Sequence, residues 1–369
     1  MRNYHTESIA LVALSNITDI GPRKMRSIIS YFKKPSLAFE LNKGKLLQVN
    51  GLSDKIVDAL LNGKEELENA RLLIEANQKR GIQTITFYDE AYPQRLKDIK
   101  DAPLVLFYQG KASLNHPRII SIVGTRKVTE YGLDITRQLV SDLAKYNCLI
   151  LSGLAYGIDI AAHKAAIEFG IPTIGVMANS LDTVYPSQHK HIANQMAMKN
   201  GGLLSENKLG TKPDPRLFPA RNRIIAGLSD AVIVVEAMKK GGACITAEIA
   251  NSYYKDVFAF PGDVRSLASE GCNNLIRNNK AQLITSAKDL EYHLNWDKEI
   301  GKLVKRQLDL STFTKPEQLI IKVLQEQPLP IDILSWKTAL QVNELASFLL
   351  GLEFQGVVKQ LPGKTFQLV

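Results

Sequence analysis

Two arginines and an asparagine, Arg221, Asn222 and Arg223, precede an apolar run at residues 224–228 that has a helical pattern. A β-branched, strand-like segment at residues 231–235 follows this run. In open α/β sheets, ligands bind at the carboxyl ends of strands and at the turns that lead into helices. The guanidinium fork matches phosphate oxygens in two-point contacts. The pattern therefore predicts a phosphate-binding arginine patch, and the simple alternative is a solvated, charged start of a helix.

Glycine turns follow several other predicted strands. The first includes residues 124–127, and the second includes residues 152–159. Such turns expose backbone N–H groups to an anion, and Arg126 adds a full positive charge. Further turns occupy residues 180–186, 241–248 and 261–263. One turn of this kind is weak evidence, but the ordered set predicts that glycines line one edge of a sheet.

Other kinds of chemistry find less support. The chain has no G-x-G-x-x-G dinucleotide fingerprint, and residues 363–365 lack the leading glycine of a P-loop because Val358 stands in its place. We therefore expect no ATP hydrolysis. Asp159 and His163 lie four residues apart on one predicted helix and could form an acid–base pair. No nucleophile is visible beside them, so helix capping and packing are the preferred roles.

Composition bounds the compartment and the kind of partner. The three cysteines lie far apart without C-x-x-C spacing, which indicates a reducing cytoplasm and predicts neither a metal site nor a cofactor. No signal peptide and no apolar run long enough to cross a membrane is visible, so we expect a soluble, cytoplasmic protein. The net charge of +9 favours a polyanionic partner. Residues 111–296 contribute +5 of it, and Lys239 and Lys240 lie near a predicted turn there.

Alternating strand and helix patterns predict a Rossmann-like, doubly wound and mostly parallel α/β sheet in the middle of the chain. The predicted strands are 119–123, 148–151, 173–177, 202–205, 231–235 and 257–259. Helical patterns between them cover 131–145, 159–168, 189–199 and 246–253. Short apolar strands separated by helices imply parallel pairing with right-handed crossovers.

The flanking segments predict three further parts. Residues 1–80 are helical and have glycine turns like those of a helix-hairpin-helix or SAM-like domain, with ordinary helical packing as the alternative. Residues 81–296 form the core with its lead-in strands, and 297–310 are charged and weakly patterned, as in a linker. Residues 311–369 predict three helices and a β-hairpin, a winged-helix-like arrangement. This module is barely basic, so a protein–protein role stays open beside DNA binding.

The ordered motifs resemble those of the DNA-processing protein A family (DprA, also called Smf) over essentially the whole chain. The resemblance rests on SIVGTR at 121–126, SGLAYGID at 152–159, LDTVYP at 181–186, FPARNRIIAGLS at 218–229, VVEA at 234–237, ITAEIA at 245–250, FPGDV at 260–264 and GCNNLIRNNKAQLI at 271–284. Two segments depart from the family pattern, at residues 178–180 and 242–244. The resemblance implies a core that binds single-stranded DNA and passes it to a RecA-type recombinase in natural transformation, without catalysis. It also implies a homodimer formed through the core.

By motif, Arg126 corresponds to the arginine of the first turn, whereas Arg221 and Arg223 belong to the RNR element. Lys190 and Lys212 lie near basic positions that flank the family's pocket. The predicted nucleic-acid-binding residues are Gly124, Thr125, Arg126, Lys127, Gly153, Tyr156, Gly157, Lys190, Lys212, Arg221, Asn222, Arg223, Gly242, Thr246 and Asn274. Base stacking on Tyr156 or Phe218 could add affinity, although packing in the core is the preferred role for Phe218.

Two alternatives remain at this point. One is a nucleotide-processing enzyme, because residues 241–248 resemble the loop of nucleoside-monophosphate phosphoribohydrolases (the LOG-like class). In that interpretation Glu236 or Glu248 assists ribosyl transfer and Arg221 holds a phosphate. The family's Pro-Gly-Gly-x-Gly-Thr string is missing, and this counts against the enzyme. The other alternative is a scaffold for protein partners, in which the basic edge of the core matters little.

Overall fold

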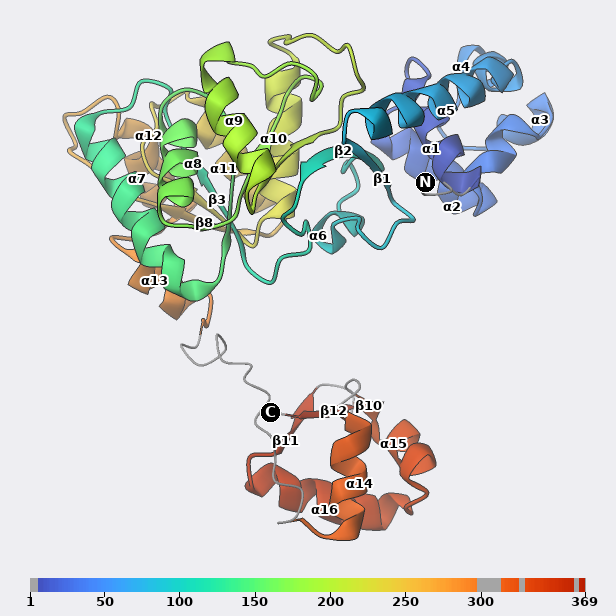
Figure 1. The fold of residues 1–369 in the computed structure, drawn as a ribbon, viewed down its shortest axis with the longest axis vertical. Helices are drawn as coiled ribbons and strands as arrows, with labels where there is room; N and C mark the ends of the chain where they lie inside the picture. Colours follow the sequence, from blue (N-terminus) through green and yellow to red (C-terminus); the bar gives the residue numbers. More distant parts are fainter. Residues whose placement is uncertain (1–5, 297–312, 325–328, 362–364, 369) are drawn as a thin grey trace. The chain divides into compact units, whose positions relative to one another are not determined.

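The computed structural model describes residues 6–296, 313–324, 329–361 and 365–368 and divides into two compact units, Met1–Lys298 and Glu299–Val369 (Figure 1). The predicted linker 297–310 and the turn at 362–364 lie outside the described residues. Within the described part, no helix is long and apolar enough to cross a membrane.

A nine-stranded sheet forms the centre of the first unit, with the strand order β1-β2-β6-β5-β4-β3-β7-β8-β9. Pairing is antiparallel between β1 and β2 and between β2 and β6, and parallel elsewhere. The prediction of a mostly parallel Rossmann-like sheet is therefore confirmed, and β3–β8 begin and end within one residue of the predicted strands. The strands are β1 (Gln83–Thr86), β2 (Val105–Gly110), β3 (Ile119–Val123), β4 (Leu149–Ser152), β5 (Thr173–Val176), β6 (Gly202–Ser205), β7 (Ala231–Val234), β8 (Asp256–Ala259) and β9 (Gln282–Leu283).

Helices cover both faces of this sheet because successive side chains of each strand point to opposite faces. Ile119 and Val123 belong to a core cluster with residues of the helices α6, α10, α11 and α12, whereas Ile120 and Ile122 belong to a cluster with α7, α8 and α13. The helices are α6 (Gln94–Lys97), α7 (Glu130–Leu143), α8 (Ile158–Glu168), α9 (Lys190–Met198), α10 (Leu217–Leu228), α11 (Gly242–Ser252), α12 (Glu270–Arg277) and α13 (Ala287–His293). Both faces of the central strands are consequently buried, and the ends of the strands remain as places where a ligand can bind.

The N-terminal helices lie beside β1 and β2 (Figure 1). They are α1 (Thr6–Asn16), α2 (Pro22–Phe32), α3 (Lys43–Leu46), α4 (Asp54–Leu61) and α5 (Lys64–Lys79). Their apolar core continues into the sheet, since one buried cluster contains Leu14 and Ile28 of these helices together with Phe107 of β2. A buried hydrogen bond between the hydroxyls of Ser8 and Thr86 (3.0 Å) crosses the same junction. The boundary after residue 80 stays a prediction.

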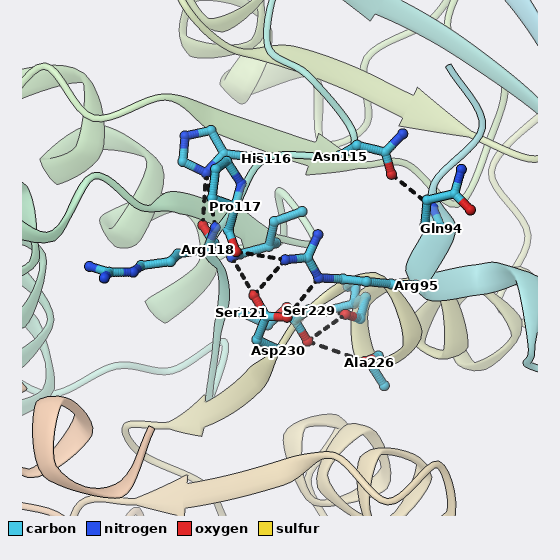
Figure 2. Close-up of polar contacts among 12 residues, drawn as sticks. Gln94, Arg95, Asn115, His116, Pro117, Arg118, Ser121, Ala226, Ser229 and Asp230 are labelled. Atoms are coloured by element: carbon cyan, nitrogen blue, oxygen red, sulfur yellow. Dashed lines mark hydrogen bonds and ion pairs between the residues drawn. The ribbon is translucent and has the colours of Figure 1, made fainter. Parts of the chain in front are cut away.

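Internal polar contacts close the amino edge of the sheet (Figure 2). Arg95 of α6 forms a two-point ion pair with Asp230, which directly precedes β7 (Nε–Oδ1 2.7 Å, Nη2–Oδ2 2.8 Å). Asp230 Oδ2 also accepts a hydrogen bond from the backbone N–H of Ile119 at the start of β3 (2.8 Å), and Arg95 donates to the carbonyl of Pro117 (3.0 Å). Because these groups satisfy one another, the carboxyl edge is left as the place for a ligand.

The second unit has its own apolar core, which contains Leu334 of α15, Leu345 and Leu349 of α16, and Phe366 of β12. Its three helices and its hairpin follow the predicted order, and a short strand between the first two helices was not predicted. They are α14 (Lys315–Leu324), β10 (Leu329–Pro330), α15 (Ile331–Thr338), α16 (Val342–Phe354), β11 (Val358–Leu361) and β12 (Thr365–Leu368). The strand order is β10-β12-β11, with antiparallel pairs.

Candidate nucleic-acid interface

A cavity of about 630 Å³ opens at the carboxyl edge of the sheet, beyond the ends of β3 and β7. Here β3 lies between β4 and β7, so the chain leaves β3 in one direction to reach β4 and returns on the other side as β7. Such a switch in strand order is where α/β sheets bind ligands. Lining residues from the predicted set are Gly124, Thr125, Arg126, Lys127, Arg221, Asn222, Gly242 and Thr246.

The loop 124–129, which carries Arg126 and Lys127, is held at both ends by Glu236. The backbone carbonyl of Glu236 accepts a hydrogen bond from the N–H of Thr125 (2.7 Å). Its buried carboxylate accepts from the N–H (3.0 Å) and the hydroxyl (2.6 Å) of Thr129. Thr129 is also the N-cap of α7, where its hydroxyl accepts from the N–H of Gly132. One residue at the end of β7 therefore fixes the loop on β3.

Gly157 allows this loop to approach the start of α8. Its φ of +77° is a conformation that side-chain-bearing residues rarely adopt. A Cβ atom at Gly157 would lie 2.1 Å from the carbonyl oxygen of Thr125. The N–H of Ile158 donates to that same oxygen (3.2 Å). The second glycine turn thus packs directly against the backbone of the first.

Four exposed cations surround the cavity: Arg126, Lys127, Lys239 and Lys240. The guanidinium of Arg126 lies 5.4 Å from the centre of the Phe218 ring, so the ring supports it through a cation–π contact. Lys239 Nζ lies 3.4 Å from Glu270 Oε1. These charges concentrate positive potential at a concave surface, which is an arrangement that attracts phosphates.

Arg221 is buried and acts as a brace between two strands, and its contact with a phosphate stays a prediction. Its Nη1 donates to the carbonyl of Gly153 (2.6 Å), which follows β4, and to the carbonyl of Val176, the last residue of β5. Burial lowers the pKa of Arg221 to about 10, and the nearby Asp159 opposes this shift. Burial raises the pKa of Asp159, and the positive charge of Arg221 reduces this rise. Asp159 in turn accepts from the N–H groups of Gly153 (3.1 Å) and Ala155 (3.4 Å). The pair forms part of the cavity floor.

Arg223 does not line the cavity at all. The helix α10 begins at Leu217, so both arginines lie within it, and residues two positions apart face different sides of a helix. Arg223 forms an ion pair with Glu206, and only 14% of its side chain is exposed. The prediction that Arg221 and Arg223 precede a helix as one patch is therefore wrong. Contact of either arginine with nucleic acid stays a prediction. The residue types were informative, but the start of the helix was placed too late.

The remaining predicted residues lie outside the cavity lining. Gly153 and Gly157 lie behind it, in the contacts described above. Tyr156 is exposed and donates to Gln188 (2.8 Å), and Asn274 on α12 accepts from Arg277 (2.6 Å). Lys190 and Lys212 are exposed on neighbouring segments. Their contacts with nucleic acid stay predictions.

Four charged residues of the cavity lining, Asp159, Lys239, Lys240 and Glu270, are missing from the predicted set. The two lysines directly precede the Gly241-Gly242 turn, and that position was a usable signal. Glu270 had no such signal, because it reaches the cavity from the start of α12, more than thirty residues after β7.

The residues proposed for catalysis are placed elsewhere. The carboxylate of Glu236 is bound to Thr129 and borders a second cavity of about 550 Å³. Glu248 is exposed on α11 and forms an ion pair with Lys280 (3.0 Å). His163 and Asp159 take different partners, since the His163 ring contacts the hydroxyl of Thr173 (2.7 Å). The geometry therefore gives the enzyme interpretation no acid–base pair in the main cavity.

Comparison with known proteins agrees with the motifs. The family model described as DNA recombination-mediator protein A matches residues 83–295, and the DprA winged helix domain matches residues 307–364. Protein Smf of Synechocystis sp. is 34% identical over 401 residues, which cover 98% of this chain and 99% of the relative.

Two solved structures resemble the chain in fold as well. The X-ray structure of DprA from Streptococcus pneumoniae has a TM-score of 0.65 at 31% identity and covers 79% of this chain and 98% of that one. A structure of DprA from Helicobacter pylori, described for its single-stranded DNA binding mode, has a TM-score of 0.52 at 33% identity and covers 58% and 95%. From these matches, the chain belongs to the DNA recombination-mediator protein A (DprA/Smf) family, whose members are described as DNA-processing proteins and recombination mediators.

Proposed function

We propose that this protein binds single-stranded DNA in the cavity at the carboxyl edge of the sheet and loads a RecA-type recombinase onto it, which protects incoming DNA in natural transformation. The observation that carries the DNA-binding part is the group of four exposed cations, Arg126, Lys127, Lys239 and Lys240, around one concave site. The H. pylori relative, a DprA described as binding single-stranded DNA, supports the choice of ligand.

The cations bind phosphates, and the glycine turns let the backbone of the DNA come close. Each phosphate that a cation neutralises releases counterions, with a log–log salt slope of about −0.7 per contact on single strands. Phosphate contacts carry no base information, so sequence preference is weak. A single strand is flexible enough to bend into a cavity, whereas duplex DNA is stiff over these lengths.

Aromatic side chains beside the cavity extend the site from phosphates to bases. Tyr185 and Phe218 form a ring pair with centroids 5.8 Å apart, next to Arg126. Tyr156 is 42% exposed and packs edge-on against His189. Stacking on such rings contributes about 1–3 kcal/mol per base and tolerates any sequence.

The recombinase partner, the homodimer formed through the core and the cytoplasmic location rest on family membership. A mediator must release its strand to the recombinase, and a site built mainly from exposed cations suits this role because such contacts form and break rapidly. Loading is tested by following the single-strand-dependent ATPase of a RecA-type recombinase with and without this protein. Stimulation by the wild type and not by Arg126→Ala is the expected result, and no stimulation by either protein contradicts loading.

The DNA-binding part is tested by fluorescence anisotropy with labelled single-stranded and duplex oligonucleotides over a salt series. We expect preference for the single strand and a slope near −3 if all four cations contact phosphates. Arg126→Ala reduces the slope by about 0.7. Arg137→Ala removes the same charge from the exposed face of α7, away from the cavity, and is the matched control. Equal effects of both variants, or binding that ignores salt, contradict the proposal.

A further inference from the structure

The lining of the cavity contains one partly exposed carboxylate beside the four cations. Glu270, the first residue of α12, lines the cavity together with Lys239 and Lys240. The other acidic residue of the lining, Asp159, is buried beside Arg221. Glu270 is therefore the lining carboxylate that an entering phosphate meets.

The position of Glu270 is set by the backbone. The N–H of Gly271 donates to the carbonyl of Ala237 (2.7 Å). A Cβ atom at Gly271 would lie 2.6 Å from the carbonyl oxygens of both Ala237 and Met238. The start of α12 thus packs closely against the segment that leads into Lys239, and no larger residue fits at position 271. Glu270 Oε1 consequently lies 3.4 Å from Lys239 Nζ.

We propose that Glu270 acts as a built-in counter-anion, which occupies Lys239 in the free protein and which a DNA phosphate displaces. This inference rests on the proposed function, because it assumes that phosphates enter this cavity. The carboxylate and the phosphate compete for the same ammonium group, and once the phosphate is bound the two anions repel each other. Glu270 thereby lowers the affinity of the site for DNA.

The ion pair is suited to displacement. Its side chains are 66% exposed for Lys239 and 39% exposed for Glu270, so water can solvate both charges when they separate. Exposed pairs of this kind are weak and are screened by salt. The ion pair therefore lowers the affinity for DNA without blocking the cavity. This suits a protein that must release its strand to a partner.

The test is single-strand binding of the full chain by anisotropy with Glu270→Gln, a substitution that keeps the size and removes the charge. We expect binding about fivefold tighter, at the upper end of what an exposed ion pair contributes. The salt slope should stay close to that of the wild type, since a phosphate contacts Lys239 in the DNA complex of both proteins. Glu248→Gln is the matched control, because Glu248 pairs with Lys280 at 3.0 Å outside the cavity. It leaves affinity and slope unchanged.

A double-mutant cycle isolates the pair. Lys239→Ala is expected to weaken binding more in the Glu270→Gln background than in the wild type, because the lysine is then no longer shared. Equal gains from Glu270→Gln and Glu248→Gln, or additive effects in the cycle, overturn the inference while wild-type binding stays intact. Absence of salt-dependent binding by the wild type overturns the proposed function, and this inference with it.

Discussion

At the scale of single residues, Arg221 and Asp159 show that a charged side chain beside a cavity can stabilise the fold, whereas other charged side chains bind the ligand. A guanidinium beside a glycine turn is the group expected to hold a phosphate, yet Arg221 is 5% exposed and its Nη1 donates to the carbonyls of Gly153 and Val176. The cations free to meet a ligand are exposed on loops. Burial decides which arginine stabilises the fold and which one can bind the ligand. The sequence pattern does not show burial.

Removing Arg221 should therefore reduce stability more than it reduces phosphate contacts. Arg221→Met removes a positive charge near the buried Asp159 together with the hydrogen bonds to Gly153 and Val176, and we expect a loss of about 3–5 kcal/mol in the free energy of unfolding. Urea unfolding followed by circular dichroism measures this loss. The double variant Arg221→Met/Asp159→Asn should recover part of it, because no unpaired charge is then buried. A stable Arg221→Met that fails only in DNA binding contradicts the brace.

His163 makes a separate prediction about pH. Burial lowers the pKa of His163 to about 3, from an ordinary value of 6.5. As the pH falls below about 6.5, the unfolded chain binds a proton that the folded state refuses, so this residue decreases stability by up to about 1.4 kcal/mol per pH unit. Urea unfolding between pH 7 and pH 5 measures the slope. We expect a shallower slope for His163→Gln, and an unchanged slope rules this contribution out.

At the scale of elements, the loop 124–129 gains its shape from its neighbours. Glu236 holds it at Thr125 and Thr129, and Gly157 supports it from the start of α8. The strands β3, β4 and β7 are adjacent in the sheet, so turns from three distant segments meet at one place. The position of this loop therefore depends on contacts with the backbone of two other segments.

Two glycines with a positive φ test this support. Gly157→Ala introduces a Cβ atom 2.1 Å from the Thr125 carbonyl, whereas Gly170, with a φ of +72°, has open space around it. Gly170→Ala should cost only about 1 kcal/mol of conformational strain. Gly157→Ala should cost clearly more and should also weaken single-strand binding, because the loop with Arg126 must move. Thermal melting and anisotropy measure the two effects, and equal behaviour of the two variants contradicts the close approach.

The carboxylate of Glu236 gives a second test at this scale. Glu236→Ala removes both hydrogen bonds to Thr129 and should lower the free energy of unfolding by about 1–3 kcal/mol. It should also weaken DNA binding, although Glu236 does not line the main cavity. Glu236→Gln retains an acceptor and should recover part of both. If neither variant changes DNA binding, the clamp has no role in the site.

At the scale of the whole molecule, the two units have different surfaces. The recognition-helix position of the winged helix is occupied by α16, which contains Glu344 and Glu353 and no lysine or arginine. Its exposed face includes Leu350 and Phe354. Base and phosphate contacts from such a helix require basic side chains, so this surface is poorly suited to DNA.

A chain that ends at Lys298 should therefore keep its single-strand affinity and its salt slope. The first unit contains the cavity and its cations, and each unit has a core of its own. Anisotropy on the truncated and the full chain measures the difference. A slope reduced by one or more contacts, about 0.7 each, would place phosphate contacts in the second unit.

The fold class, the core strands and the order of the three helices and the hairpin in the C-terminal unit are predictable from the sequence alone. These follow from short-range patterns: buried strands are continuous apolar runs, and helices repeat every 3.6 residues. The sequence also indicated the edge of the sheet on which a ligand would bind, because glycine turns after parallel strands meet at one edge. Tertiary structure alone decided which charges reach the cavity. Arg223 forms an ion pair with Glu206, and Arg221 is buried. Glu270 lies beside Lys239 because α12 packs on the segment after β7. Burial and pairing depend on contacts between residues far apart in the chain, and no local pattern contains them.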